Sequence, residues 1–318
     1  MTTESADKTD QLPPWFTSAL DTASAASEIE VDGATIAFET WGPQNAPGIV
    51  LIHGSNAHRE WWRFVAPFLA DQFRVAALDL SGNGDSGWRE RYSAEILARE
   101  VWAVCEAAHL GERPFIVGHS FGGFVALEVA HRYGADMGGV IFNDFTVAPR
   151  ERYVEWGMRA EREDVAARRG TRVYPDVETA MGRFRFIPEQ PTRYPPVLDY
   201  IGRAGLHEVE GGVTWKFDPA LFDYLEMGAD QEDKFVGLAC RSAVVLGEFS
   251  EDEGAFEGEH MRDLTAGALP VFHIPGTHHH MMFEEPVALA VAFKAILLGW
   301  LAEDRRPAMT AALAQRRG

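Results

Sequence analysis

Short, continuously apolar runs alternate with helix-like segments along most of this chain. The runs lie at residues 48–52, 73–78, 114–117, 140–142, 242–246 and 269–274. Between them, residues 94–110 show the spacing of apolar side chains that is typical of an amphipathic helix. Strands that are apolar on both faces belong to parallel sheets covered by helices on both sides. The sequence therefore predicts an α/β fold with a mostly parallel, doubly wound sheet.

The alternation is interrupted once, from about residue 150 to residue 234. This interval holds no buried strand-like run and is rich in prolines and aromatic residues, with charged helical pieces at 151–169. We expect a mainly helical cap here, inserted after the sixth strand at residues 140–142. That count includes the two strands of a hairpin around Asp32-Gly33, a dipeptide that favours tight turns.

The predicted core is then formed by residues 13–149 and 235–304. Residues 1–12 are polar and are expected to form a disordered tail. Residues 305–318 are expected to be loose, because Pro307 should end the preceding helix.

Residues 118–122 read Gly-His-Ser-Phe-Gly, between the apolar run at 114–117 and a helix-like segment at 123–130. In the order strand, G-x-S-x-G, helix, this pentapeptide places the serine on a sharp turn with its hydroxyl exposed at the end of the strand. The glycines remove Cβ atoms that would clash in such a turn. A glycine-rich loop with a chance serine is the alternative, and the flanking strand and helix argue against it. Ser120 is therefore the predicted nucleophile.

A serine hydroxyl is a weak nucleophile at neutral pH and needs a base within hydrogen-bond reach. Three consecutive histidines, His278, His279 and His280, follow the last predicted strand, at the sheet edge where functional groups gather. Histidine tracts also bind metals, but three adjacent side chains point in different directions, and no His-x-x-x-His helix accompanies them. We expect the base to come from this tract, and we expect no metal and no cofactor.

Four motifs occur in order: Leu-Ile-His-Gly at 51–54, Asp-Leu-Ser-Gly-Asn-Gly-Asp-Ser at 79–86, the Ser120 turn, and a stretch at 275–286 that ends in Glu-Glu-Pro. With these motifs the chain resembles the α/β-hydrolase superfamily, in its capped, esterase- and epoxide-hydrolase-like branch. The resemblance implies a catalytic histidine seven residues before the final proline, which is His279. His278 and His280 remain alternatives.

The same resemblance implies an oxyanion hole made of two backbone amides, those of Phe121 and Ser55. Each aimed donor of this kind stabilises a tetrahedral intermediate by about 3 kcal/mol. Asp79 belongs to the second motif, and its expected role is to bond the amides of its own turn. Trp61 and Trp62 either line the pocket or belong to the core.

The acid that should orient the histidine departs from the family pattern. After the strand at 242–246 the family commonly reads Gly-Glu-x-Asp, and here Ser250 takes the place of the aspartate. Other members place the acid after the preceding strand, where Asp144 fits. Asp144 is the preferred acid, Glu251 is the alternative, and a capping role at the strand end is the structural reading of Asp144.

A serine at the turn limits the chemistry. Dehalogenases and epoxide hydrolases of this superfamily use aspartate there, and a serine ether would not hydrolyse readily. The expected function is hydrolysis of a carboxylic ester, lactone or related acyl compound through an acyl-serine. The alternatives are C–C bond hydrolysis of diketones and a catalytically weak ligand-binding protein. The aromatic-rich interval predicts a small-molecule substrate that is medium-sized and partly apolar.

The composition of the chain excludes some classes of binding partner. The net charge of −19, with no basic block, argues against nucleic acid and anionic membrane surfaces. The two cysteines, Cys105 and Cys240, lie in apolar segments and are expected to be buried thiols. The first residues lack the apolar core of a secretory signal, and no apolar run reaches the roughly 18 residues of a membrane span, so a cytoplasmic protein is expected.

Overall fold

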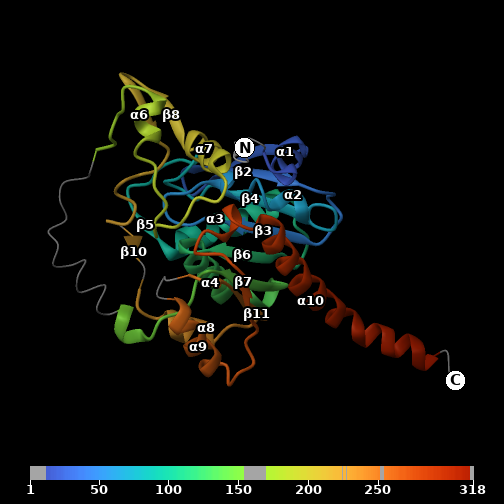
Figure 1. Ribbon diagram of the computed structural model, residues 1–318. Coiled ribbons are helices and arrows are strands. Elements are labelled where there is room, and N and C mark those ends of the chain that lie inside the picture. The colour runs from blue at the N-terminus through green and yellow to red at the C-terminus, as the bar shows by residue number, and fades with distance from the viewer. Residues whose placement is uncertain (1–11, 154–169, 224, 227, 251–253, 316–318) are drawn as a thin grey trace, which may run out of the picture.

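The computed structural model describes residues 12–153, 170–223, 225–226, 228–250 and 254–315. An eight-stranded sheet lies at its centre, in the order β1-β2-β4-β3-β6-β7-β11-β12 (Figure 1). The strands are β1 (Ala25–Val31), β2 (Ala34–Trp41), β3 (Gly48–Ile52), β4 (Arg74–Leu78), β6 (Phe115–His119), β7 (Gly139–Asn143), β11 (Ser242–Gly247) and β12 (Val271–Ile274). β2 is antiparallel to β1 and β4, and the other neighbours are parallel, so the predicted fold class is confirmed.

Helices cover the sheet on both faces. They are α1 (Pro14–Asp21), η1 (Arg59–Trp62), α2 (Ala66–Leu69), α3 (Ala94–Ala107), α4 (Phe121–Tyr133), η2 (Gly134–Asp136), α8 (Gln231–Val236), α9 (Gly254–Leu264), η3 (Met281–Phe283) and α10 (Pro286–Gln315). Successive side chains of β3 enter two separate clusters, Val50 and Ile52 on the α3/α4 side, Ile49 and Leu51 on the α2/α10 side. This is why the central strands are apolar throughout.

Helix boundaries follow local chemistry. The Ser93 hydroxyl accepts a hydrogen bond from the amide of Ile96 and caps α3. The apolar spacing of residues 60–70 is that of a single helix, but the chain forms η1 and then starts α2 next to Pro67. Proline has no amide to donate and fits best in the first turn of a helix, so a new helix starts here.

The interval at 150–234 contains more strand than predicted. Its described part holds α6 (Val177–Met181), α7 (Pro195–Ala204), a hairpin of β8 (Leu206–Val209) and β9 (Gly212–Trp215), the short β10 (Leu225–Glu226) and the start of α8. β10 pairs with β5 (Tyr92–Ser93) of the core. Figure 1 shows α6, α7 and β8 together on one side of the sheet. Most of the charged helical piece expected at 151–169, and nearly all of the predicted N-terminal tail, lie outside the described residues.

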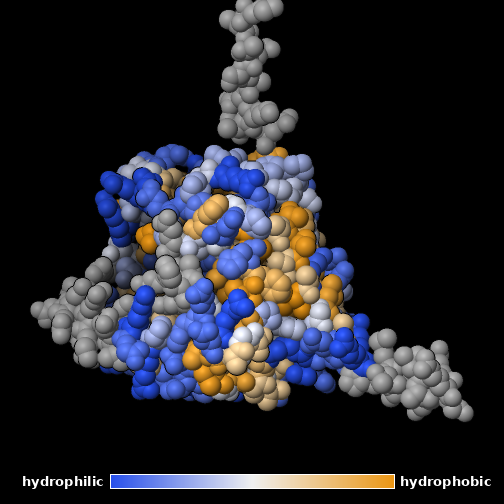
Figure 2. All heavy atoms as spheres, turned by 60° about the horizontal axis from the view of Figure 1, so that its bottom comes forward, coloured by the Kyte–Doolittle hydropathy of each residue, from blue (hydrophilic) through white to orange (hydrophobic). Residues whose placement is uncertain are grey.

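α10 is longer than predicted. The expected end at Pro307 is wrong, since the helix continues to Gln315 and projects from the body (Figure 1). On a projecting helix, water can take the carbonyl that proline leaves unbonded. Residues 286–306 are long and apolar enough to cross a membrane by composition, which was not predicted, but Phe293 and Leu297 are buried in the core. Figure 2 shows apolar side chains on the body and a hydrophilic band where the molecule narrows toward this projecting end.

The two cysteines are both free thiols. Cys105 is buried, as predicted, whereas Cys240 is only partly buried. Burial raises the pKa of Cys240 to about 11, so this thiol stays protonated at neutral pH.

Candidate active site

Ser120 occupies a strained turn between β6 and α4. Its φ of 53° and ψ of −122° lie outside the regions that non-glycine residues favour. The amide of Ser120 donates to the carbonyl of Asn143 (3.0 Å), and its carbonyl accepts from the amide of Gly123 (2.7 Å). These bonds over-determine the turn, which is the usual condition for strain at functional sites.

The glycines of the motif are required by close backbone contacts. A Cβ on Gly118 would lie 2.1 Å from the carbonyl oxygen of Gly122. A Cβ on Gly122 would lie 2.5 Å from the carbonyl oxygens of Ile52 and His53. The start of α4 therefore packs directly on the end of β3, and this contact brings the His53-Gly54 turn to the serine.

His279 and Asp144 form a buried pair. Nδ1 of His279 lies 2.5 Å from Oδ2 of Asp144, and both side chains are 2% exposed. The other carboxylate oxygen of Asp144 accepts the amide of Gly247 at 2.9 Å. A carboxylate on Nδ1 holds the proton there, so Nε2 is the basic nitrogen.

The other candidates for these roles lie elsewhere. Nδ1 of His278 contacts Oε1 of Glu284 at 2.8 Å. Ser250, at the family's usual acid position, donates its hydroxyl to Oδ2 of Asp144 at 2.5 Å. Glu251 lies outside the described residues. Within the part of the chain that the structure describes, Asp144 and His279 are therefore the predicted pair that it brings together.

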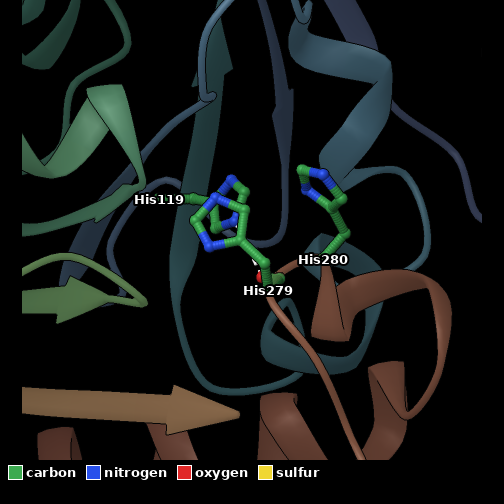
Figure 3. Close-up of side chains that lie close together, drawn as sticks. All are labelled: His119, His279 and His280. Atoms are coloured by element: carbon green, nitrogen blue, oxygen red, sulfur yellow. Dashed lines mark hydrogen bonds between the residues drawn. The ribbon is translucent and has the colours of Figure 1, made fainter. Parts of the chain in front are cut away.

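The loop that carries His279 is tied to the serine turn. Nε2 of His119, the residue before Ser120, bonds the carbonyl of His279 at 3.0 Å. The His119 and His279 rings lie 4.8 Å apart, centroid to centroid, and the His280 ring lies 4.8 Å from His279 and 5.4 Å from His119. Figure 3 shows the three side chains close together.

Burial keeps the histidines around His279 neutral. It lowers the pKa of His119 and of His280 well below the usual value, and the neighbouring His279 lowers both further. Burial also lowers the pKa of His53, whose Nε2 accepts the amide of Leu80 at 3.1 Å. Of these buried rings, His279 is the one that faces a carboxylate, which favours it as the proton acceptor.

The expected oxyanion donors flank the serine. A Cβ on Gly54 would lie 3.3 Å from Cβ of Ser120, so the turn that carries the Ser55 amide abuts the nucleophile. Phe121 is the first residue of α4, and the first amides of a helix have no partner within it. Both amides therefore remain the predicted oxyanion donors.

The motif around Asp79 stabilises a loop. The Asp79 carboxylate is fully buried, accepts the amides of Arg59 (2.5 Å) and Asp85 (2.9 Å), and pairs with the Arg59 guanidinium. A Cβ on Gly84 would lie 2.2 Å from this carboxylate, which explains the glycine. Asp79 thus has the structural role predicted for it.

A family model for the alpha/beta hydrolase family matches residues 49–292, which is most of the chain. The chain belongs to this family. Relatives of the chain by sequence include proteins named as esterases.

Several curated relatives of this family member are esterases. The chain is 30% identical over 158 residues to the esterase Rv0045c of Mycobacterium tuberculosis, covering 48% of this chain and 51% of the relative. It is 42% identical over 94 residues to a pimeloyl-[acyl-carrier protein] methyl ester esterase of Methylococcus capsulatus, covering 29% of this chain and 34% of the relative. The matches therefore span about half or less of these relatives' length.

Among solved structures, the thioesterase domain from the curacin biosynthetic pathway is similar in fold, with a TM-score of 0.72 and 22% sequence identity. The similarity covers 87% of this chain and 100% of that domain, and it supports the fold alone.

Aromatic rings surround the histidine tract of this hydrolase. Trp61 and Trp62 are both buried. The Trp61 ring lies 5.2 Å from that of His280, and Phe186, from the interval at 150–234, lies 5.0 Å from the same ring. The Gln190 side chain accepts the amide of His280 at 2.7 Å. The inserted segment therefore contacts the loop that carries His279.

Three participants were not predicted from sequence. His119 was part of the turn motif but was not considered as a neighbour of the tract. Ser250 was noted only because it occupies the position where the family usually has an acid. Nothing in the sequence around Gln190 indicated its contact with His280. The position of His119 directly before the serine is the one signal that could have placed it beside His279.

Proposed function

We propose that this hydrolase cleaves a carboxylic ester, lactone or related acyl compound through an acyl-serine at Ser120. The observation that carries the proposal is the 2.5 Å contact between Nδ1 of His279 and Oδ2 of Asp144, on a loop bonded to the residue before Ser120. A serine on a strained turn, a histidine and an orienting carboxylate are the parts that acyl transfer needs.

In the first half of the proposed reaction, Ser120 attacks the acyl carbon. Nε2 of His279 takes the hydroxyl proton, and Asp144 stabilises the resulting imidazolium. The amides of Phe121 and Ser55 stabilise the oxyanion. The imidazolium then gives its proton to the leaving alkoxide, which leaves the acyl-serine.

In the second half, water replaces the leaving group. His279 takes a proton from the water as it attacks the acyl-serine, and returns that proton to Oγ of Ser120 when the ester bond breaks. The products are an acid and the free enzyme. The neutral states of His119 and His280 keep positive charge away from the ring that must become charged.

The aromatic surroundings support a small, partly apolar acyl substrate. The rings of Trp61, Phe186 and Phe283 pack around His280. The centroids of these three rings lie 4.9–6.2 Å from one another. Such surfaces favour an apolar acyl or alcohol group over a charged one. Ester cleavage is also supported by the names of the esterase relatives.

Labelling with a fluorophosphonate tests the nucleophile. We expect a single adduct, mapped by peptide mass spectrometry to Ser120, and none in Ser120→Ala. The same variant should reduce kcat for a 4-nitrophenyl ester by roughly 10⁶-fold, as loss of a catalytic serine does. No adduct in protein shown to be folded by circular dichroism would refute the activated serine and favour a ligand-binding role. Labelling without ester turnover would direct the search to lactones and diketones.

A further inference from the structure

Three buried imidazoles meet beside the proposed nucleophile. One ring nitrogen from each of His119, His279 and His280 lies within 4.8 Å of those of the other two. The rings come from the end of β6 and from the loop after β12, segments that are 160 residues apart in sequence. Figure 3 shows His280 beside the other two rings, which overlap in this view.

The hydrogen bonds of two rings are those of metal ligands. Nε2 of His119 donates to the carbonyl of His279, so its lone pair is on Nδ1, which has no hydrogen-bond partner among the described residues. Nδ1 of His279 faces the Asp144 carboxylate, so its lone pair is on Nε2. Imidazole ligands commonly donate their other N–H to a carbonyl or carboxylate, which fixes the tautomer and the ring orientation.

The third ring is buried without a partner. His280 is 3% exposed, and neither of its ring nitrogens has a hydrogen-bond partner of good geometry within the described ranges, although the Ile187 backbone lies near enough to raise its pKa slightly against the effect of burial. A buried polar atom left unpaired costs about 1–3 kcal/mol. Binding a cation at a ring nitrogen of His280 would remove that cost, and turning the ring toward the cation would give up only the weak interaction with the Ile187 backbone.

We infer that His119, His279 and His280 bind a divalent transition-metal ion, with Zn²⁺ the best match, and that the bound ion inhibits the hydrolase. Inhibition follows because the ion occupies the His279 lone pair that must accept the Ser120 proton. This consequence rests on the proposed function, whereas the binding itself does not.

The donor set selects the class of ion. Three neutral imidazoles suit Zn²⁺, Cu²⁺ and Ni²⁺, whereas Mg²⁺ and Ca²⁺ prefer oxygen ligands. Tetrahedral zinc, with Zn–N bonds of about 2.0–2.1 Å, places its nitrogen ligands about 3.4 Å apart. The cluster must therefore contract modestly from 4.8 Å, and water can be the fourth ligand. His278 is not part of this set, because it contacts Glu284.

Calorimetry with ZnCl₂, and the visible spectrum after addition of CoCl₂, test binding without reference to activity. We expect one site per chain in the wild type and in Ser120→Ala, with cobalt bands of a tetrahedral nitrogen site. His280→Phe keeps an aromatic ring against Trp61 and should weaken binding by at least about tenfold. His207→Ala, which removes an exposed histidine of β8, is the matched control and should bind like the wild type. MgCl₂ should give no binding.

Inhibition is then measured on ester hydrolysis. Zn²⁺ should inhibit the wild type and His207→Ala equally, EDTA should reverse this, and His280→Phe should need at least about tenfold more Zn²⁺. If His280→Phe does not fold, His280→Asn replaces it.

Equal binding by wild type and the His280 variant, or no binding by folded wild type, would overturn the metal site. A cobalt spectrum that depends on His280, in a protein that labels with no fluorophosphonate, would keep the metal site and refute the proposed function instead.

Discussion

At the scale of single residues, the central feature is how Asp144 is held. Its φ of 47° is rare for a non-glycine residue and turns its side chain from the end of β7 toward the loop after β12. One carboxylate oxygen accepts the Gly247 amide, and the other receives both the His279 ring and the Ser250 hydroxyl. Three donors hold the carboxylate in one position, and a carboxylate fixed in this way can orient a histidine.

Replacing Asp144 by asparagine tests this arrangement. We expect kcat for a 4-nitrophenyl ester to fall by about 10³–10⁴-fold with little change in KM, because the amide favours the wrong histidine tautomer. The matched control is Glu251→Gln, the other candidate acid, which should keep nearly full activity. Full activity in Asp144→Asn, or a large loss in Glu251→Gln, would contradict the assignment of the acid.

Sequence reasoning found some of these residues and missed others for a physical reason. Ser120 lies inside a local motif, and His279 lies at the distance from a proline that the family resemblance implies, so both could be proposed before the structure was known. The bond from Ser250 to Asp144 joins residues 106 positions apart. It depends on how two strand ends are aligned in the sheet, which no local pattern reports.

At the scale of elements, the contact between α4 and β3 sets the position of the serine turn. Gly122→Ala would place a methyl group 2.5 Å from two backbone oxygens that cannot move independently of β3. We expect it to lower the free energy of unfolding by about 1–3 kcal/mol, as overpacking does, and to reduce kcat as well.

Gly299→Ala is the matched control for that substitution. Gly299 is exposed in α10 with open space around its Cα, so alanine should raise the free energy of unfolding by about 0.5–1 kcal/mol. Urea unfolding measures both variants. Equal effects of the two substitutions would show that the α4–β3 contact is less tight than described.

A second contact between elements joins the inserted segment to the core. The Tyr92 hydroxyl donates to Asp218 (2.9 Å) and accepts the Arg89 amide (3.0 Å), and the Asp218 amide donates to the Gly82 carbonyl (2.7 Å). Tyr92 and Asp218 are almost fully buried. This cluster fixes the segment around Asp218 against the loop after β4.

Tyr92→Phe should therefore lower the free energy of unfolding by about 1–3 kcal/mol, because it leaves buried polar groups without this hydroxyl. Tyr133→Phe keeps its ring stacked on Trp102 and should change stability by less than about 0.5 kcal/mol. Urea unfolding of both variants gives the comparison. A loss no larger for Tyr92→Phe than for Tyr133→Phe would argue against the cluster.

The elements differ in how far the sequence could predict them. The buried strands were predicted because strands covered on both faces must be apolar throughout. The β8–β9 hairpin was missed because its strands are only half-buried and carry polar residues such as His207 and Glu208. The end of α10 was misplaced because a proline stops a helix only where its lost hydrogen bond cannot be replaced.

At the scale of the whole molecule, the fold keeps several histidines neutral. Burial lowers the pKa of His58 to about 3, with the nearby His53 adding to the effect, while the ring bonds the carbonyl of Ile201 at 3.2 Å. His53, His119 and His280 are shifted in the same direction. In the unfolded chain each ring has a pKa of about 6.5, so below that pH the unfolded state binds protons that the folded state does not.

The contribution of each such histidine to stability is therefore complete above about pH 6.5 and falls as the pH is lowered, by up to about 1.4 kcal/mol per pH unit. Glu60 and Glu100 act in the opposite direction, because burial raises their pKa values. The pH dependence of the wild type's free energy of unfolding is therefore a sum over several groups.

The difference in free energy of unfolding between the wild type and a variant isolates a single histidine. His58→Asn cannot titrate at this position, so its deficit relative to the wild type should shrink by about 2 kcal/mol between pH 7 and pH 5. His207→Asn replaces a ring that is exposed on β8. Its difference from the wild type in free energy of unfolding should stay constant over the same pH range. Urea unfolding of the three proteins at pH 7, 6 and 5 measures this, and a His58→Asn deficit that does not change with pH would mean that the folded protein protonates His58 as readily as the unfolded chain does.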